Sequence, residues 1–155
     1  YTFNLVPVGV TISGLGVKAV ISHKYSPPAC GSGYPVKGDL ISNIFETSGS
    51  TGVAYNSILW KGTLGGPSQD QGVVRFQMAS ADNIGGPWNF IGGSTCGASD
   101  WFTPGAADTA AEIGCYSELN NKRYYKYKIE ICSDDCVLVG TYTPTVTGVV
   151  VNWSP

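Results

Sequence analysis

Apolar and polar residues alternate with a period of two over several short stretches of this chain. In residues 73–79, VVRFQMA, the apolar side chains Val74, Phe76 and Met78 occupy every second position. Residues 124–131, YYKYKIEI, alternate in the same way. A period of two places one set of side chains on each face of a strand, so both stretches predict strands with one buried face.

Further short stretches with strand-like composition lie between clusters of Gly, Pro, Asn and Asp. We expect additional strands at residues 39–47, 53–61, 88–91, 137–142 and 146–153. No stretch sustains the 3.6-residue period of a long amphipathic helix. Seven or eight short strands separated by turn signals predict an all-β fold, either a β-sandwich or a jelly roll.

The two faces of the stretch 124–131 differ in chemistry. Tyr124, Lys126 and Lys128 occupy alternate positions with Glu130, and tyrosines and isoleucines occupy the positions between them. The apolar set predicts a core-facing side. The tyrosine and the charged side chains must then meet water or a partner, and tyrosine favours contacts between proteins. Tyr124 and Lys126 are therefore candidate subunit-interface residues.

The N-terminal residues have their own alternating pattern. Val6, Val8, Val10 and Ile12 occupy every second position, and Pro7 argues against a helix. The pattern predicts an apolar strand-like segment over residues 1–22. Two interpretations remain open: the segment is an arm that contacts a neighbouring subunit, or it is the first strand of its own domain. Under the first, the four apolar residues form the subunit interface.

Residues 23–38 are rich in proline and glycine and predict a linker or ordered loop. The expected organisation is therefore an arm or strand at 1–22, a linker or loop at 23–38 and a β-sandwich domain at 39–155. The chain opens on Tyr1 without a signal-peptide pattern, so we expect it to begin at a mature terminus.

Charged residues make up only 13% of the chain, against roughly 25% in an ordinary soluble domain. The formal net charge is −2, which argues against nucleic acid as a partner. A weakly charged surface rich in Gly, Ser and Thr is typical of secreted and cell-surface proteins. It also limits the repulsion between copies of the chain that pack together.

Five cysteines are numerous for a chain with few other reactive side chains. We expect two disulfides, Cys96–Cys115 and Cys132–Cys136, which fit an extracellular location. Cys30 is then the odd cysteine; it pairs within the chain, leaving another cysteine free, or it pairs between chains. Because zinc sites need a second close pair or a histidine pair, the spacing predicts no metal site.

The sequence contains no constellation that supports catalysis. There is one histidine and no G-x-S-x-G motif, and nothing selects a pair of carboxylates from the acidic residues. We therefore predict that the protein is not an enzyme and has no cofactor.

Several aromatic residues support an alternative function in carbohydrate binding. Trp101 and Phe102 lie in a glycine-rich segment, and exposed aromatic residues in loops often bind ligands. Together with Tyr34 and Asp100 they form the candidate carbohydrate site. Packing of the aromatic side chains in the core is the competing interpretation.

Three stretches resemble the galactose-binding-like, discoidin-type jelly roll. Residues 73–92, VVRFQMASADNIGGPWNFIG, are similar to its strand–turn–strand motif, with Ser80 and Asp82 in the turn and Trp88 on the return strand. The stretch NKRYYKYKIEI is similar to its Arg-Tyr strand and PTVTGVVVNW to its closing strand. The resemblance covers residues 39–153. It implies a jelly roll of the kind found in pilin-like and surface proteins of little-studied bacteria.

Pattern, composition and resemblance together predict an extracellular structural subunit of a pilus-like filament that assembles through its N-terminal arm. The alternative is a secreted module for carbohydrate binding and adhesion. The expected partners are copies of the chain itself, with a second pilus component as a further candidate, and surface glycans under the alternative. The chain departs from a type IV pilin, because Leu5 stands where such pilins carry glutamate and no long helix follows Tyr1.

Overall fold

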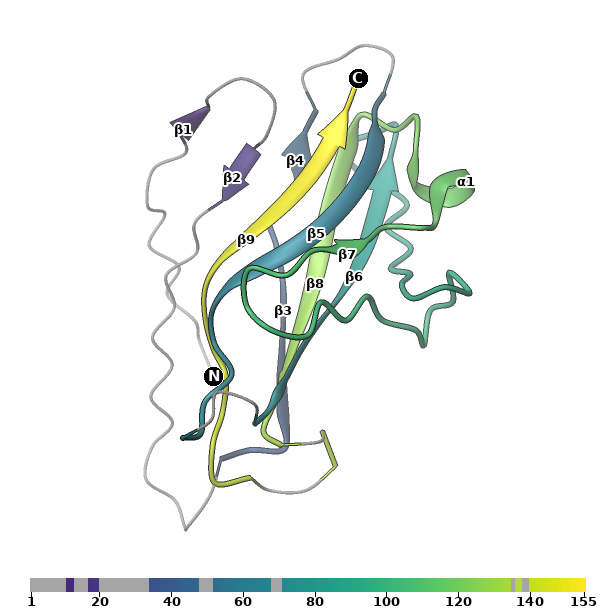
Figure 1. Cartoon of the computed structure of the whole chain (residues 1–155). Coiled ribbons are helices and arrows are strands. Elements are labelled where there is room, and N and C mark those ends of the chain that lie inside the picture. The colour runs from purple at the N-terminus through teal and green to yellow at the C-terminus, as the bar shows by residue number, and fades with distance from the viewer. Residues whose placement is uncertain are drawn as a thin grey trace.

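Two antiparallel β-sheets pack against each other, with the apolar faces of their long strands forming one core (Figure 1). The computed structural model describes residues 11–12, 17–19, 34–47, 52–67, 71–134, 136–137 and 140–155, with the backbone alone for the first two ranges. Within these residues the fold is all-β apart from one single-turn helix, α1, Tyr116–Leu119. The all-β sandwich expected from the sequence is confirmed. The described part of the chain contains no helix that is long and apolar enough to span a bilayer.

The first sheet has the strand order β1-β2-β9-β5-β7. Its strands are β1, Thr11–Ile12; β2, Val17–Ala19; β5, Ala54–Thr63; β7, Ala111–Glu112; and β9, Thr145–Ser154. The long strands β5 and β9 pair over almost their whole lengths. On its other edge β9 pairs with β2, but only through Val149–Val151. The sheet is therefore built on one long antiparallel pair, β5 with β9. The two-residue strand β1 pairs with β2 at the far edge.

The second sheet is built around β8, Tyr124–Cys132. On one side β8 pairs along its whole length with β6, Val73–Ala81. On the other side it pairs first with β3, Lys37–Ile41, and then with β4, Phe45–Glu46. Because β8 is the central strand, its two edges fix the register of the whole sheet. β3 begins at Lys37, two residues before the expected start of the sandwich domain.

The single strand expected at residues 39–47 is divided into β3 and β4 at Ser42. The amide of Ser42 donates to the carbonyl of Tyr127, and the hydroxyl of Ser42 accepts from the amide of Tyr127 at 3.0 Å. The side chain thus replaces a backbone partner, and the strand cannot continue in the same register. A serine that substitutes for a backbone group opposite a distant residue is a long-range contact, which strand periodicity does not report.

The strand expected at residues 88–91 is not formed, and the described residues of 137–142, which are 137 and 140–142, form no strand, so both expectations are wrong there. In the first, only Ile91 bonds to β6, through both backbone groups of Met78. Phe102 bonds in the same way to Phe76, so two separate segments share the free edge of β6 and neither can extend along it. In the second, Gly140 forms a single bridge with Tyr34.

The core lies between the two sheets and is rich in aromatic side chains. The largest fully buried side chain is Trp60, whose indole nitrogen donates to the carbonyl of Gly105 at 3.2 Å. A tight approach of β5 to β9 at the edge of this core requires glycine at position 62. A Cβ there would lie 1.9 Å from the carbonyl oxygen of Thr145, and the residue has a φ of +142°.

Three tyrosines, Tyr55, Tyr125 and Tyr127, form a cluster at the centre of the core. Tyr55 packs edge-on against Tyr125, and Phe45 stacks on both Tyr125 and Tyr127. Burial raises the pKa of each of the three hydroxyls well above the usual tyrosine value. The hydroxyls of Tyr55 and Tyr127 have no hydrogen-bond partner among the described residues.

We expect the protein to lose stability as the pH rises above about 10, the pKa of tyrosine in an unfolded chain. Above that pH the unfolded chain releases protons that the folded chain retains. Tyr127→Phe and Tyr55→Phe should each reduce this slope by up to about 1.4 kcal/mol per pH unit. At pH 7 each substitution removes an unpaired buried hydroxyl and should leave the free energy of unfolding equal or higher. Urea titrations at pH 7 and pH 11 measure both effects; a marked loss of stability at pH 7 would contradict the unpaired state.

Two disulfides join the cysteine pairs expected from the sequence, Cys96–Cys115 and Cys132–Cys136. The first ties the loop over β6 to the residue that precedes α1, and Cys115 is fully buried in the core. The second closes a short turn after β8. Cys30 lies outside the described residues.

Because the two loops differ in length, the two disulfides should differ in their effect on stability. Replacing Cys96 and Cys115 together with alanine should lower the free energy of unfolding by about 3 kcal/mol, the value for a loop of this size. The Cys132–Cys136 disulfide closes a turn with a sequence separation of only 4. Replacing these two cysteines with alanine should therefore lower the free energy of unfolding by less. Urea unfolding of both double variants measures the difference, and equal losses would contradict the chain-entropy account.

Candidate binding surface

One face of the β3-β8-β6 sheet points away from the core, and we call it the outer face. Along β8 the buried side chains Tyr125, Tyr127 and Ile129 alternate with Lys126 and Lys128, which are half-buried. The alternation predicted from the sequence is confirmed for these positions. Residues directly opposite each other in an antiparallel pair share a face, so the register also assigns residues of β3 and β6 to the outer face.

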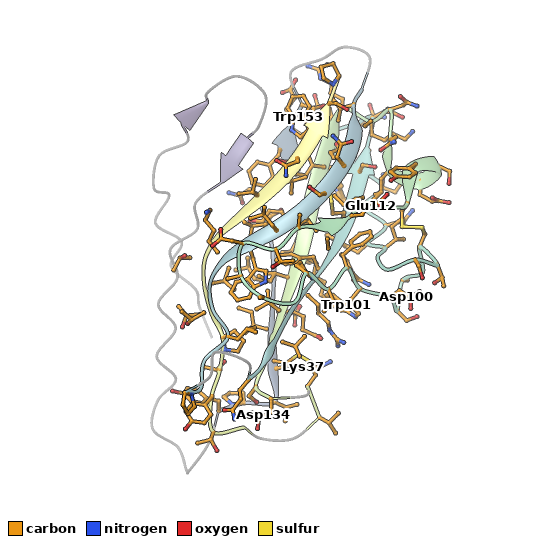
Figure 2. The ribbon with its side chains drawn as sticks, in the orientation of Figure 1. Lys37, Asp100, Trp101, Glu112, Asp134 and Trp153 are labelled. Carbon is orange, nitrogen blue, oxygen red and sulfur yellow. A yellow bond between two sulfur atoms is a disulfide. The ribbon has the colours of Figure 1, made fainter. Side chains whose placement is uncertain are left out.

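Glu130 is the centre of an ionic network on this face. Its side chain is only 5% exposed, although the sequence pattern predicts contact with water. Arg75 of β6, directly opposite, donates to Glu130 Oε1 from Nε at 2.7 Å and from a terminal nitrogen. Lys37 of β3 lies 3.2 Å from Oε2 (Figure 2). Two cations thus compensate the buried carboxylate, which would be a costly unpaired charge without them.

A loop folds over the part of the outer face that β6 provides. Gln77 points outward in β6 but is only 3% exposed, because its amide nitrogen donates to the carbonyls of Ala98 and Asp100 at 2.7 and 2.9 Å. The backbone pairing of Phe102 with Phe76 and the Cys96–Cys115 disulfide hold the same loop. One buried amide therefore fixes the position of the loop relative to the sheet.

Two tryptophans lie against cations of the outer face. The guanidinium of Arg75 lies 4.8 Å from the ring centroid of Trp101, and the ammonium of Lys128 lies 5.2 Å from the same centroid. The ammonium of Lys126 lies 5.6 Å from the ring centroid of Trp88. These distances are within the range of cation–π attraction. Both indoles are half-buried, so each retains exposed surface.

The four residues proposed for carbohydrate binding do not form one site. Asp100 and Trp101 lie side by side on the loop over β6 (Figure 2). Phe102 is 4% exposed and belongs to the core, so the expectation of an exposed side chain is wrong at this position. Tyr34 pairs with Gly140, close to Asp134 at the end of the sandwich, away from Trp101 (Figure 2).

The proposed interface residues of the N-terminal segment lie largely outside the described part of the chain. Val6, Val8 and Val10 are not described, and for Ile12 the backbone alone is described, in β1. Tyr124 and Lys126 lie on the outer face, as expected. The interface prediction for the N-terminal residues therefore stays a prediction.

Sequence reasoning did not identify Trp88, Arg75 and Gln77 as parts of this surface. The alternation of β6 gives a signal for Arg75 and Gln77, since both occupy outward positions. The contact between Trp88 and Lys126 joins a loop to a strand 38 residues later, and no local pattern reports it.

Among the described residues, one group of side chains has the spacing to hold a metal ion: Glu130, Cys132 and Cys136. Both of its sulfurs are in a disulfide, and its carboxylate is paired with two cations.

The outer face presents aromatic rings and cations on one sheet, and its buried carboxylate is paired with two cations. Comparison of the chain with protein-family models, with curated proteins and with solved structures found no match.

Substitution of Gln77 should release the loop. Gln77→Met removes the donor to two carbonyls, and we expect the free energy of unfolding to fall by about 1–3 kcal/mol. Gln77→Glu should cost at least as much, since it places a carboxylate against the same carbonyl oxygens. Urea unfolding measures the loss, and a red shift of tryptophan fluorescence reports exposure of Trp101. The control is Asn89→Asp, because Asn89 is an exposed amide after β6. It should change the free energy of unfolding by less than about 0.5 kcal/mol. A stable Gln77→Met variant with unshifted fluorescence would contradict the role of this amide.

Proposed function

We propose that this protein is an extracellular structural subunit of a pilus-like filament, in which the N-terminal arm of one copy adds a strand to the β9 edge of the next. Strand addition uses the unpaired N–H and C=O groups of an edge strand, and alternate side chains of the added strand fill the neighbouring groove. The proposal depends on one observation, the pairing of β2 with β9.

That pairing supports the proposal because it shows that β9 accepts a strand from the N-terminal segment. β2 pairs with Val149–Val151 in the middle of the ten-residue strand β9. Among the described residues, no other strand pairs with this edge of β9. We infer that the arm of a neighbouring copy takes the position of β2 on β9 by exchange.

The connection between arm and body is long enough for exchange. Residues 20–36 separate β2 from β3. A segment of this length reaches up to about 55 Å when extended. That reach exceeds the width of a small domain, so the same arm can pair with its own β9 or with that of an adjacent copy.

The body has the core of an independent domain. The buried core side chains among the described residues come from Val53, from β5, β6, β8 and β9 and from residues 102–119, and Leu40 of β3 and Phe45 of β4 pack against them. The described contact of the arm with the body is the backbone pairing of β2 with β9 at a sheet edge, and strands are added to a sheet at such an edge.

Composition and covalent structure support the extracellular location of such a subunit. Two disulfides stabilise the sandwich, and disulfides persist in oxidising compartments. The low content of charged residues reduces repulsion between packed copies. The resemblance of the strands to surface and pilin-like proteins points in the same direction.

Deletion of residues 1–22 tests the proposal. We expect the shortened chain to stay folded and soluble but to form no filaments in negative-stain electron microscopy. A synthetic peptide of residues 1–22 should bind the shortened chain, measured by fluorescence anisotropy. A peptide with Val8→Asp and Val10→Asp should not bind, because burying an unpaired carboxylate costs several kcal/mol.

The control peptide carries the same added charge on the other face of the strand, through Gly9→Asp and Thr11→Asp, and should retain most of the binding. Filaments formed by the shortened chain would refute the proposal. So would a shortened chain that melts at a sharply lower temperature and binds no peptide, since the arm would then be only an internal strand.

A further inference from the structure

Lysine 126 differs from the other cations of the outer face. Lys37 and Arg75 pair with Glu130, and Lys128 lies 3.8 Å from Asp39. Within the described residues no carboxylate lies in ion-pair distance of Lys126, whose ammonium contacts the ring of Trp88. Its positive charge is thus held in place on the surface without a counter-charge from the protein.

The balance of charge on the outer face is positive. The face carries four cations, Lys37, Arg75, Lys126 and Lys128, against two carboxylates, Asp39 and Glu130. Glu46 of β4, opposite Tyr124, is neutralised by Arg123 and leaves this balance unchanged. The loop over β6 adds the carboxylate of Asp100, which accepts a hydrogen bond from the hydroxyl of Thr95. One positive charge remains in excess, on a chain whose formal net charge is −2. The face is therefore complementary to an anion.

Apolar surface lies beside the free charge. Trp88 and Trp101 are half-buried, and each indole lies against a lysine of β8. Ile41, which lies directly opposite Lys128 in β3, is 48% exposed. Lys126 and Lys128 are two residues apart on one strand face, so their α-carbons lie roughly 7 Å apart. Two aromatic–cation pairs thus repeat along β8.

We propose that the outer face of the β3-β8-β6 sheet binds an acidic polysaccharide. A carboxylate of the polymer pairs with Lys126, and the apolar C–H face of its sugar ring packs on the exposed surface of Trp88. Trp101 with Lys128 provides the next contact along the polymer. A binding surface of this kind combines a flat apolar area with a few placed polar groups. The inference does not depend on strand addition at β9, which concerns the other sheet; it assigns Lys126, a candidate interface residue, to the polymer instead.

Neutral sugars fit this surface less well because they leave the charge of Lys126 unpaired. Single-stranded nucleic acid also combines rings with negative charge, but it requires a basic groove that follows the backbone. The single excess charge of this face does not provide one. A carboxylated sugar polymer is the ligand whose charge density fits.

The test is a fluorescence titration of the full-length protein with polygalacturonate, with dextran as the neutral polymer and oligothymidylate as the nucleic acid. We expect polygalacturonate to change tryptophan fluorescence and to bind more weakly as salt is raised. Lys126→Gln should weaken binding at least about tenfold, the effect of losing one charge-assisted hydrogen bond. Lys126→Arg should retain binding, and circular dichroism checks that the variants are folded.

Lys61→Gln is the matched control, because Lys61 lies on the other sheet and pairs with Asp108. It should bind polygalacturonate like the unmodified protein. The inference is overturned by any of four results: no binding of polygalacturonate, equal binding of dextran, stronger binding of oligothymidylate, or an equal loss of binding in Lys61→Gln and Lys126→Gln.

Discussion

The alternation of side chains along β8 is the constraint on which the rest of the structure depends. Its inward tyrosines, Tyr125 and Tyr127, form the centre of the core with Tyr55 of the opposite sheet. Its outward residues carry the ionic network and the aromatic contacts of the outer face. A slip of one residue in register would exchange the two sets, burying lysines and exposing tyrosines. Both faces of the strand therefore hold it in the same register, against β6 on one side and β3 on the other.

Strand periodicity and cysteine spacing predicted the elements that depend on residues close in the sequence. The alternating stretch at 124–131 lies within β8, which begins at the same residue and ends one residue later. Both disulfides join the expected cysteines, one of them a pair only four residues apart. Contacts between residues far apart in the sequence determine the features that these patterns did not predict. Ser42 interrupts an expected strand because it bonds to Tyr127, and Gln77 is buried because a later loop folds over it. Period-two alternation distinguishes the faces of a strand but does not show what covers the outward one.

The two proposed activities use different parts of the sandwich. Assembly uses the edge of β9, in the first sheet, whereas the acidic polymer binds the outer face of the second sheet. The core separates the two sites, so a filament built through β9 keeps its charged, aromatic face available. The disulfide from Cys96 to Cys115 and the amide of Gln77 hold that face rigid. A rigid body with an arm on a long connection is the arrangement that strand exchange requires, because only the arm has to move.

The exchange itself is tested most directly by cross-linking the paired positions Lys18 and Val150, which face each other across β2 and β9. One population carries Lys18→Cys and the other Val150→Cys, both with Cys30→Ser, and the two are unfolded, mixed and allowed to assemble. A short thiol cross-linker should then join one chain of each kind into dimers, visible by gel electrophoresis and confirmed by peptide mapping. The account predicts these mixed dimers. A chain that carries both substitutions is the control. Cross-links within this control chain, with none between the two single-cysteine populations, would contradict the account.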